Sequence, residues 1–289
     1  MNIPISLSLF MIYVFNLAWS AQDAFPAGEE TLGEFYARYE VDNWPGKNGY
    51  VVPGIKLDAL FTNDNQLVVD HETWIDMGGE RVVMRQLTTG DNHLIVNIAV
   101  ARTCETAHQI LFSHLVRPKS MQPFEPPALP YGEVRITDIG DVCFGLPQQE
   151  KETFHSIEFV RNNIVILLRT KLDTTMDARS IAKAIDEVIL EQPVYPNWRS
   201  SGLWISIDRF EITNVNVKSG STIPIILSVT DPMNESFIKA WELSAGGILE
   251  EDGKISYYAE GSGRQTITLL VANQSGLAAS AQIELVVMK

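Results

Sequence analysis

The pattern of apolar and polar positions divides the chain into two stretches. Between residues 25 and 192, apolar runs of strand type alternate with helical patterns, which predicts an α+β domain. From residue 206 to residue 289, short alternating runs recur about every eight to twelve residues between Gly, Pro, Asn and Asp, which predicts an all-β sandwich. Residues 193–205, which contain Pro, Ser and Gly, form the linker between the two predicted domains.

The α+β stretch contains the same succession of elements twice. Residues 80–118 predict strand, turn, strand and helix, with Pro118 ending the helix. Residues 155–193 repeat this order around a turn at Asn162-Asn163, since asparagine tolerates the left-handed backbone of a two-residue hairpin. We interpret the two ββα units as an internal duplication. They are predicted to share one antiparallel sheet, with both helices packed on one face.

Two arginines flank this second turn in the segment "EFVRNNIVILLRTK". A pair of arginines at short distance suits an anion such as phosphate or carboxylate. Arg161 lies beside the turn, however, and Arg169 lies further along the return strand, where the backbone twist separates the two positions. Because arginine side chains are mostly exposed, we predict two solvent-facing side chains on an ordinary hairpin.

The sandwich stretch carries a set of residues with a known parallel. The set consists of Trp241, Ser244-Ala245-Gly246-Gly247, Tyr258-Ala259, Gly263, Thr266-Ile267-Thr268, Asn273, Gly276 and the closing residues 283–287. These residues resemble the PKD-type and related immunoglobulin-like modules of bacterial extracellular proteins, over a little more than a quarter of the chain. The resemblance implies an immunoglobulin-like sandwich with Trp241 in its core. It also implies a spacer, an adhesion element or a carbohydrate-proximal appendage, none of which is catalytic.

The first twenty residues predict export. They carry no charged side chain, an apolar stretch runs from Ile3 to Ala18, and Ala18 and Ser20 provide small residues before a cleavage site at Ala21. A retained anchor is the alternative, but this stretch is shorter than the roughly 20 residues that a membrane-spanning helix needs. No later segment is long and apolar enough to span a membrane. We therefore predict a signal peptide at residues 1–20 and a periplasmic, secreted or cell-surface location.

The net charge of −14 bears on which partners the protein can bind, and the two cysteines bear on a disulfide or a zinc site. Both predicted domains are acidic, so neither offers a basic face to nucleic acid. In an exported protein the even pair, Cys104 and Cys143, predicts one disulfide, with two buried thiols as the alternative. Neither cysteine has a metal-ligating neighbour at a useful spacing, which argues against a zinc site.

The segment "VVDHETWID" is the strongest candidate for catalysis. His71 lies next to Glu72 and close to Asp76, and a histidine among carboxylates suits a general base or a metal ligand. Adjacent residues of a strand point to opposite faces, however, so His71 and Glu72 would diverge, which favours a polar strand end. The chain also lacks the Gly-x-Ser-x-Gly, His-Glu-x-x-His and phosphate-loop motifs.

Four aromatic residues have two interpretations. Trp198, Trp204, Tyr257 and Tyr258 suit stacking on a sugar ring, but large aromatic side chains also dominate packing at interfaces. We predict that the two tryptophans pack the domains together. Tyr257 and Tyr258 are adjacent on a predicted strand, so at most one of them enters the core.

The segment "TDPMNES" offers oxygen atoms from Asp231, Asn234 and Glu235. Such oxygen atoms suit calcium. A tight turn uses the same residue types, and we predict a turn without a metal or any other cofactor.

Together, these patterns predict an exported two-domain protein with a non-catalytic binding or structural role in the cell envelope or at the cell surface. The α+β domain would recognise a protein or glycan partner, and the immunoglobulin-like module would present or dock it. The alternative is an extracytoplasmic hydrolase, with its site near His71 and the immunoglobulin-like module as an appendage.

Overall fold

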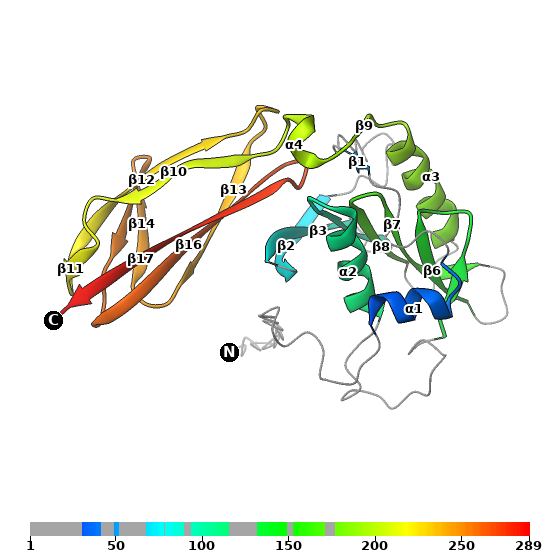
Figure 1. Cartoon of the computed structure of the whole chain (residues 1–289), viewed down its shortest axis with the longest axis horizontal. Coiled ribbons are helices and arrows are strands. Elements are labelled where there is room, and N and C mark those ends of the chain that lie inside the picture. Colours follow the sequence, from blue (N-terminus) through cyan, green and yellow to red (C-terminus); the bar gives the residue numbers. More distant parts are fainter. Residues whose placement is uncertain are drawn as a thin grey trace, which may run out of the picture.

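The computed structural model describes residues 31–41, 49–51, 68–77, 79–89, 94–115, 132–148, 153–170 and 177–289, and of residues 68–71 it describes the backbone alone. The predicted signal peptide lies outside these residues. The fold is mostly β, with several antiparallel sheets. Figure 1 shows a seven-stranded sheet with its helices at one end and two four-stranded sheets at the other. We refer to these parts as the first region and the second region.

The first region is built on a sheet with the strand order β2-β3-β4-β8-β7-β6-β5, in which all neighbours are antiparallel. Its strands are β2 (Val68–Met77), β3 (Glu80–Thr88), β4 (Leu94–Val100), β5 (Val134–Ile136), β6 (Val142–Pro147), β7 (Phe154–Arg161) and β8 (Ile164–Thr170). Its helices are α1 (Leu32–Arg38), α2 (Cys104–Leu115) and α3 (Ala178–Leu190). The predicted order of strand, strand and helix occurs in β3-β4-α2 and again in β7-β8-α3, and the two units meet where β4 pairs with β8.

Helices cover both faces of this sheet, so the prediction that α2 and α3 share one face is wrong. Val165 and Leu167 of β8 belong to the apolar cluster that contains the buried residues of α2. Ile164, Ile166 and Leu168 belong to the cluster that contains those of α3. Successive strand residues point to opposite faces, so the two helices lie on opposite sides. The unbroken apolar run "IVILL" is typical of a strand that is buried on both faces.

Capping residues determine where two of these helices begin. At α3, the N-cap residue Asp177 accepts a hydrogen bond from the backbone N–H of Arg179 at 3.2 Å. At α1, the Thr31 hydroxyl accepts from the Glu34 backbone at 3.2 Å, and the Glu34 carboxylate accepts from the Thr31 backbone at 2.8 Å. This reciprocal pair satisfies two backbone donors that the helix itself cannot bond.

The second region consists of the sheets β10-β12-β15-β14 and β11-β17-β16-β13. Its strands are β10 (Ser206–Ile212), β11 (Asn216–Lys218), β12 (Thr222–Thr230), β13 (Phe237–Leu243), β14 (Gly247–Glu251), β15 (Lys254–Tyr258), β16 (Gly263–Asn273) and β17 (Ala278–Met288). All neighbours are antiparallel except β11 and β17, which are parallel. Side chains of both sheets meet in one apolar cluster, with Ile223 and Tyr257 from one sheet and Ile267 and Leu285 from the other.

Short elements connect the two regions. The strand β1 (Tyr50–Val51) pairs with β9 (Val194–Tyr195), and the single-turn helix α4 (Trp198–Ser201) follows. They lie between the seven-stranded sheet and the second region (Figure 1). In the described part of the chain, no helix has the length and apolar character that crossing a membrane would require.

Candidate functional site at the junction of the two regions

The residues predicted as catalytic candidates lie on β2, the edge strand of the seven-stranded sheet. The backbone of His71 belongs to this strand, and its side chain is outside the described residues. Glu72 and Asp76 occupy alternating positions and therefore share one face. Each lies directly opposite an arginine of β3: Glu72 accepts from Nε of Arg85 at 2.8 Å, and Asp76 lies 3.4 Å from Nε of Arg81.

Both arginines also contact the second region. Arg81 donates two hydrogen bonds to Glu242 of β13, from Nη1 to Oε1 at 3.0 Å and from Nη2 to Oε2 at 2.9 Å. Arg85 donates through Nη1 to the backbone carbonyl of Gln274, in the turn between β16 and β17. The two carboxylates of β2 thus orient two arginines that join the regions.

Sequence reasoning missed these arginines, although the sequence contains a signal for them. Gly78-Gly79 separates β2 from β3, and a chain folded at this point places Asp76 opposite Arg81 and Glu72 opposite Arg85. Opposite charges at paired positions stabilise an antiparallel hairpin. The contacts with the second region were beyond such reasoning, because they join residues far apart in the sequence.

An apolar contact lies beside the arginines. Trp74 of β2 packs against a small cluster of Val83, Ala272 and Ala278. Ala272 and Ala278 face each other on β16 and β17. Their short side chains let the β2–β3 hairpin approach the second region closely, because no larger group keeps the backbones apart.

Trp198 and Trp204 pack the two regions together, as predicted. Their ring centroids are 5.6 Å apart, and the guanidinium carbon of Arg102 lies 5.0 Å from the Trp198 ring and 5.1 Å from the Trp204 ring. The Trp204 indole N–H donates to the carbonyl of Ala278 at 2.9 Å, and Nη2 of Arg102 reaches the same carbonyl at 3.5 Å. A cation between two aromatic rings strengthens this contact by the attraction of its charge to the ring faces.

Ionisable groups are buried at the same place. Glu80, the first residue of β3, accepts from the backbone N–H of Arg102 at 2.6 Å. Burial raises the pKa of Glu80 and lowers the pKa of Arg102. Burial, and then the nearby charge of Glu80, raises the pKa of Tyr50. Perturbed pKa values also accompany structural networks. Here Glu80 and Arg102 hold the start of α2 against the short elements that connect the two regions.

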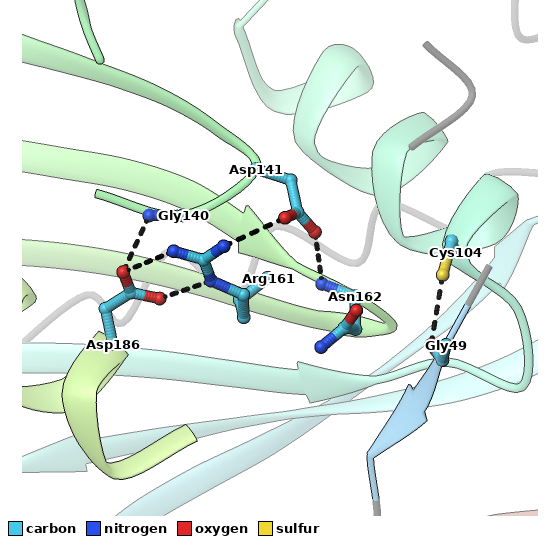
Figure 2. A network of polar contacts seen from close by, with 7 residues as sticks. All are labelled: Gly49, Cys104, Gly140, Asp141, Arg161, Asn162 and Asp186. Atoms are coloured by element: carbon cyan, nitrogen blue, oxygen red, sulfur yellow. Dashed lines mark hydrogen bonds and ion pairs between the residues drawn. The ribbon is translucent and has the colours of Figure 1, made fainter. Parts of the chain in front are cut away.

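A second polar network fixes the turn between β7 and β8. Figure 2 shows Arg161 between two carboxylates. Its Nε and Nη2 each donate to Asp186 of α3 at 2.7 Å, and its Nη1 donates to Asp141 at 3.0 Å. The same carboxylates accept from backbone donors, Gly140 at 2.9 Å and Asn162 at 2.6 Å. The prediction of a solvent-facing Arg161 is therefore wrong, because both acids come from other elements.

The other arginine of this segment behaves as predicted. Arg169 has an exposed side chain, and its Nη2 lies 3.6 Å from Oε1 of the buried Glu158. Because Arg161 is fully engaged by Asp186 and Asp141, the two arginines do not form a clamp for an anion.

The predicted hairpin turn is confirmed, and it anchors the strand β1, which pairs with β9 between the two regions. Asn162 has a φ of 53°, in the left-handed region that asparagine tolerates. The side chain of Asn163 donates to the carbonyl of Ala101 at 2.9 Å and accepts from the backbone N–H of Val51 at 2.7 Å. Val51 pairs with Val194 of β9. The hairpin tip therefore positions the segment that leads into the junction.

Cys104 and Cys143 are both buried, and the structure holds no bond between their sulfur atoms, so it does not bear out the predicted disulfide. The Cys104 thiol donates to the carbonyl of Gly49 at 3.2 Å, as Figure 2 shows. Cys104 begins α2 on one side of the sheet, whereas the side chain of Cys143 lies in the cluster under α3 on the other. Burial raises the pKa of both thiols.

The segment "TDPMNES" forms a turn, as predicted. Asp231 accepts from the backbone N–H groups of Met233 at 3.1 Å and Glu235 at 3.0 Å, and from the side chain of Asn273 at 3.2 Å. Its oxygen atoms therefore close the turn. Over the part of the chain that the structure describes, no three His, Cys, Asp or Glu residues are grouped in a way that would hold a metal ion.

No protein-family model matches this chain, and no curated protein shows significant similarity to it.

Proposed function

We propose that this protein is an exported, non-catalytic binding or structural component of the cell envelope or cell surface. An α+β domain, residues 25–192, recognises a protein or glycan partner. An immunoglobulin-like module, residues 206–289, presents that domain through the linker at residues 193–205. The uncharged apolar stretch at residues 1–20 supports export.

The strand order of the second region supports the immunoglobulin-like assignment. When the strands other than β11 are lettered A to G along the chain, the first sheet, β10-β12-β15-β14, has the spatial order A-B-E-D. The strands β13, β16 and β17 of the second sheet are then C, F and G, as in immunoglobulin domains. Immunoglobulin domains carry a buried tryptophan on strand C. Trp241 lies on β13, is half-buried and packs against the core clusters.

The observation that carries the non-catalytic proposal is the use of Glu72 and Asp76 in ion pairs with arginines that reach the second region. A general base must reach the proton that it removes from a substrate. These carboxylates instead hold Arg85 and Arg81, and those arginines contact Gln274 and Glu242. Residues suited to chemistry are used to fix one region against the other.

Conservative substitutions at these positions test the proposal. Glu72→Gln and Asp76→Asn remove the charge and preserve the shape, and His71→Ala tests the hydrolase alternative. Glu251→Gln, at an exposed position of β14, is the matched control. Each protein is assayed with chromogenic ester, peptide, phosphate and glycoside substrates, and its thermal unfolding midpoint is recorded. We expect background hydrolysis throughout, with the lowest midpoint for Glu72→Gln, because Arg85 is then buried without an ionic partner.

The opposite result identifies a hydrolase. Turnover by the wild type that His71→Ala or Glu72→Gln abolishes, at an unchanged unfolding midpoint, would overturn the proposal. Export is tested separately, by fractionating cells that produce the full chain with a C-terminal tag and determining its N-terminal residue. We expect an extracytoplasmic protein that begins at Ala21, and a cytoplasmic protein that retains residues 1–20 would contradict the predicted location.

A further inference from the structure

The outer face of the β10-β12-β15-β14 sheet carries an uncharged patch. Ile223, Tyr257 and Ile248 point into the core cluster, so the alternating positions on these strands point outward. Two outward side chains are well exposed, Tyr258 by 41% and Leu249 by 51%. We call the outer patch the set Thr222, Pro224, Gly247, Leu249, Ser256 and Tyr258.

The register arranges the outer patch in two rows across three strands. Tyr258 lies between Thr222 of β12 and Gly247 of β14, and Ser256 lies between Pro224 and Leu249 in the next row. Neighbouring strands are about 4.8 Å apart and alternate residues about 7 Å apart, so the rows cover an area of about 10 by 7 Å. The following row holds Lys254 opposite Glu251, and this pair of charges marks the boundary of the patch.

A hollow of about 420 Å³ adjoins this patch, and its lining includes Asn216, Val217 and Lys218 of β11. Thr222 and Pro224 belong both to its lining and to the outer patch. The other polar groups of its lining are mainly amides and hydroxyls, such as those of Asn214, Asn216 and Ser221. Among the lining residues, which all belong to the described range 177–289, Lys218 is the one that carries a charge. On a chain with a net charge of −14, this is an unusual stretch of surface without carboxylates.

We infer that the outer patch and the adjoining hollow bind an uncharged polysaccharide. The exposed faces of Tyr258 and Leu249 suit the C–H faces of a sugar ring, since an aromatic ring offers apolar area at little entropic cost. The amides and hydroxyls of the hollow can donate to and accept from sugar hydroxyls. Gly247 leaves the flank of Tyr258 open, because a Cβ at this position would meet no atom within 4 Å.

The size and the charge of the patch argue against a protein partner and against a polyanion. A standard protein interface involves about 20–30 residues on each side, far more than this patch provides. A polyanion such as nucleic acid or an acidic polysaccharide requires several cations, and the lining supplies Lys218 alone. The inference rests on the proposed function in one respect, because it assumes an extracytoplasmic location where a polysaccharide is accessible.

Affinity electrophoresis tests the inference with the mature chain, residues 21–289. The protein is run in native gels that contain a soluble mixed-linkage glucan, xylan or galactomannan, and alginate serves as the acidic control. We expect at least one neutral polysaccharide to retard the wild type. Tyr258→Ala should weaken binding at least about tenfold, as expected for the loss of an anchoring aromatic residue. Tyr258→Phe should retain binding because it keeps the ring.

A second substitution guards against a misfolded variant. Gly247→Gln introduces a side chain into open space beside Tyr258, so it should preserve the unfolding midpoint and abolish retardation. Phe237→Ala removes an exposed aromatic residue from the other sheet and should change nothing. The inference is wrong if no neutral polysaccharide retards the protein, if alginate alone does, or if both variants bind normally. An exported, non-hydrolytic chain with this result keeps the proposed function and loses only the polysaccharide site.

Discussion

The two regions bury antiparallel sheets in different ways. Helices cover both faces of the seven-stranded sheet, and its central strand β8 has five successive buried residues, Ile164–Leu168. The two four-stranded sheets cover each other, and β17 alternates between buried residues such as Leu285 and exposed ones such as Val286. A sheet covered on both faces therefore appears in the sequence as a continuous apolar run, whereas a half-covered sheet appears as alternation.

One ion pair from each region shows a corresponding difference in burial. In the first region, Arg161 and Asp186 meet between α3 and the sheet, with side chains exposed by 18% and 5%. In the second region, Arg209 and Glu211 lie on the surface, with side chains exposed by 52% and 57%. Breaking a buried pair leaves a charge without a partner, but breaking a surface pair exposes both groups to water. The comparison predicts a large mutational effect for the first pair and a small one for the second.

The largest effect is expected for Asp186→Ala. It leaves the guanidinium of Arg161 half-buried with Asp141 as its remaining partner and removes the acceptor of the Gly140 N–H. The free energy of unfolding should fall by about 3–5 kcal/mol in urea titrations. Asp186→Asn retains an acceptor for Gly140 and should cost less. A loss below about 1 kcal/mol for the alanine variant would place this pair with the surface pairs.

The buried His108 of α2 should make stability depend on pH. Burial lowers the pKa of His108 from its ordinary 6.5 to about 4, so between these values the unfolded chain binds a proton that the folded chain does not. The free energy of unfolding should therefore fall as the pH decreases from 6.5 to 4, by about 3 kcal/mol from this group. His108→Gln should remove this part of the decrease, as measured by urea titrations at several pH values. Equal slopes for the variant and the wild type would contradict the prediction.

A smaller effect is expected at the junction for Trp204→Phe. This change keeps an aromatic ring beside Arg102 and removes the N–H that donates to the carbonyl of Ala278. Calorimetry should record a loss of about 1 kcal/mol, typical of one hydrogen bond, because Nη2 of Arg102 still reaches the carbonyl of Ala278. Trp198→Phe, which keeps a ring against the same guanidinium, is the matched control and should cost less. Equal losses would indicate that the rings, and not the hydrogen bond, hold the junction.

The smallest effect is expected for Glu211→Ala, which breaks the exposed pair with Arg209. Its cost should stay within about 0.5 kcal/mol, the range for isolated surface pairs. Urea titration beside Asp186→Ala provides the direct comparison. A cost similar to that of Asp186→Ala would remove the distinction between the two regions.

Local features of the fold were predictable from the sequence. The turn at Asn162-Asn163, the capping residue Asp177 and the recurring strands of residues 206–289 depend on neighbouring residues, so their patterns are visible in one segment. The placement of α2 and α3 required the observation that "IVILL" has no polar face. The prediction of one helical face overlooked this.

The candidate site was predictable only in part. The sequence singled out Glu72 and Asp76, but the contact of Arg85 with Gln274 joins residues 189 positions apart, and nothing local indicates it. The same holds for Arg161, whose partners Asp141 and Asp186 lie 20 and 25 positions away on other elements. Such partners are brought together by the topology, which a single-sequence pattern does not specify.

The strand β17 gives the second region a mechanical property. It begins at Ala278, whose carbonyl binds Trp204 at the junction, and it runs beside β16 to Met288 at the far end. Its other neighbour, β11, is parallel to it and holds that far end. A pull along β17 would load all of its hydrogen bonds in shear, so they would have to rupture together rather than open one after another. Tension between the junction and the far end would therefore meet the stiffest direction of the second region.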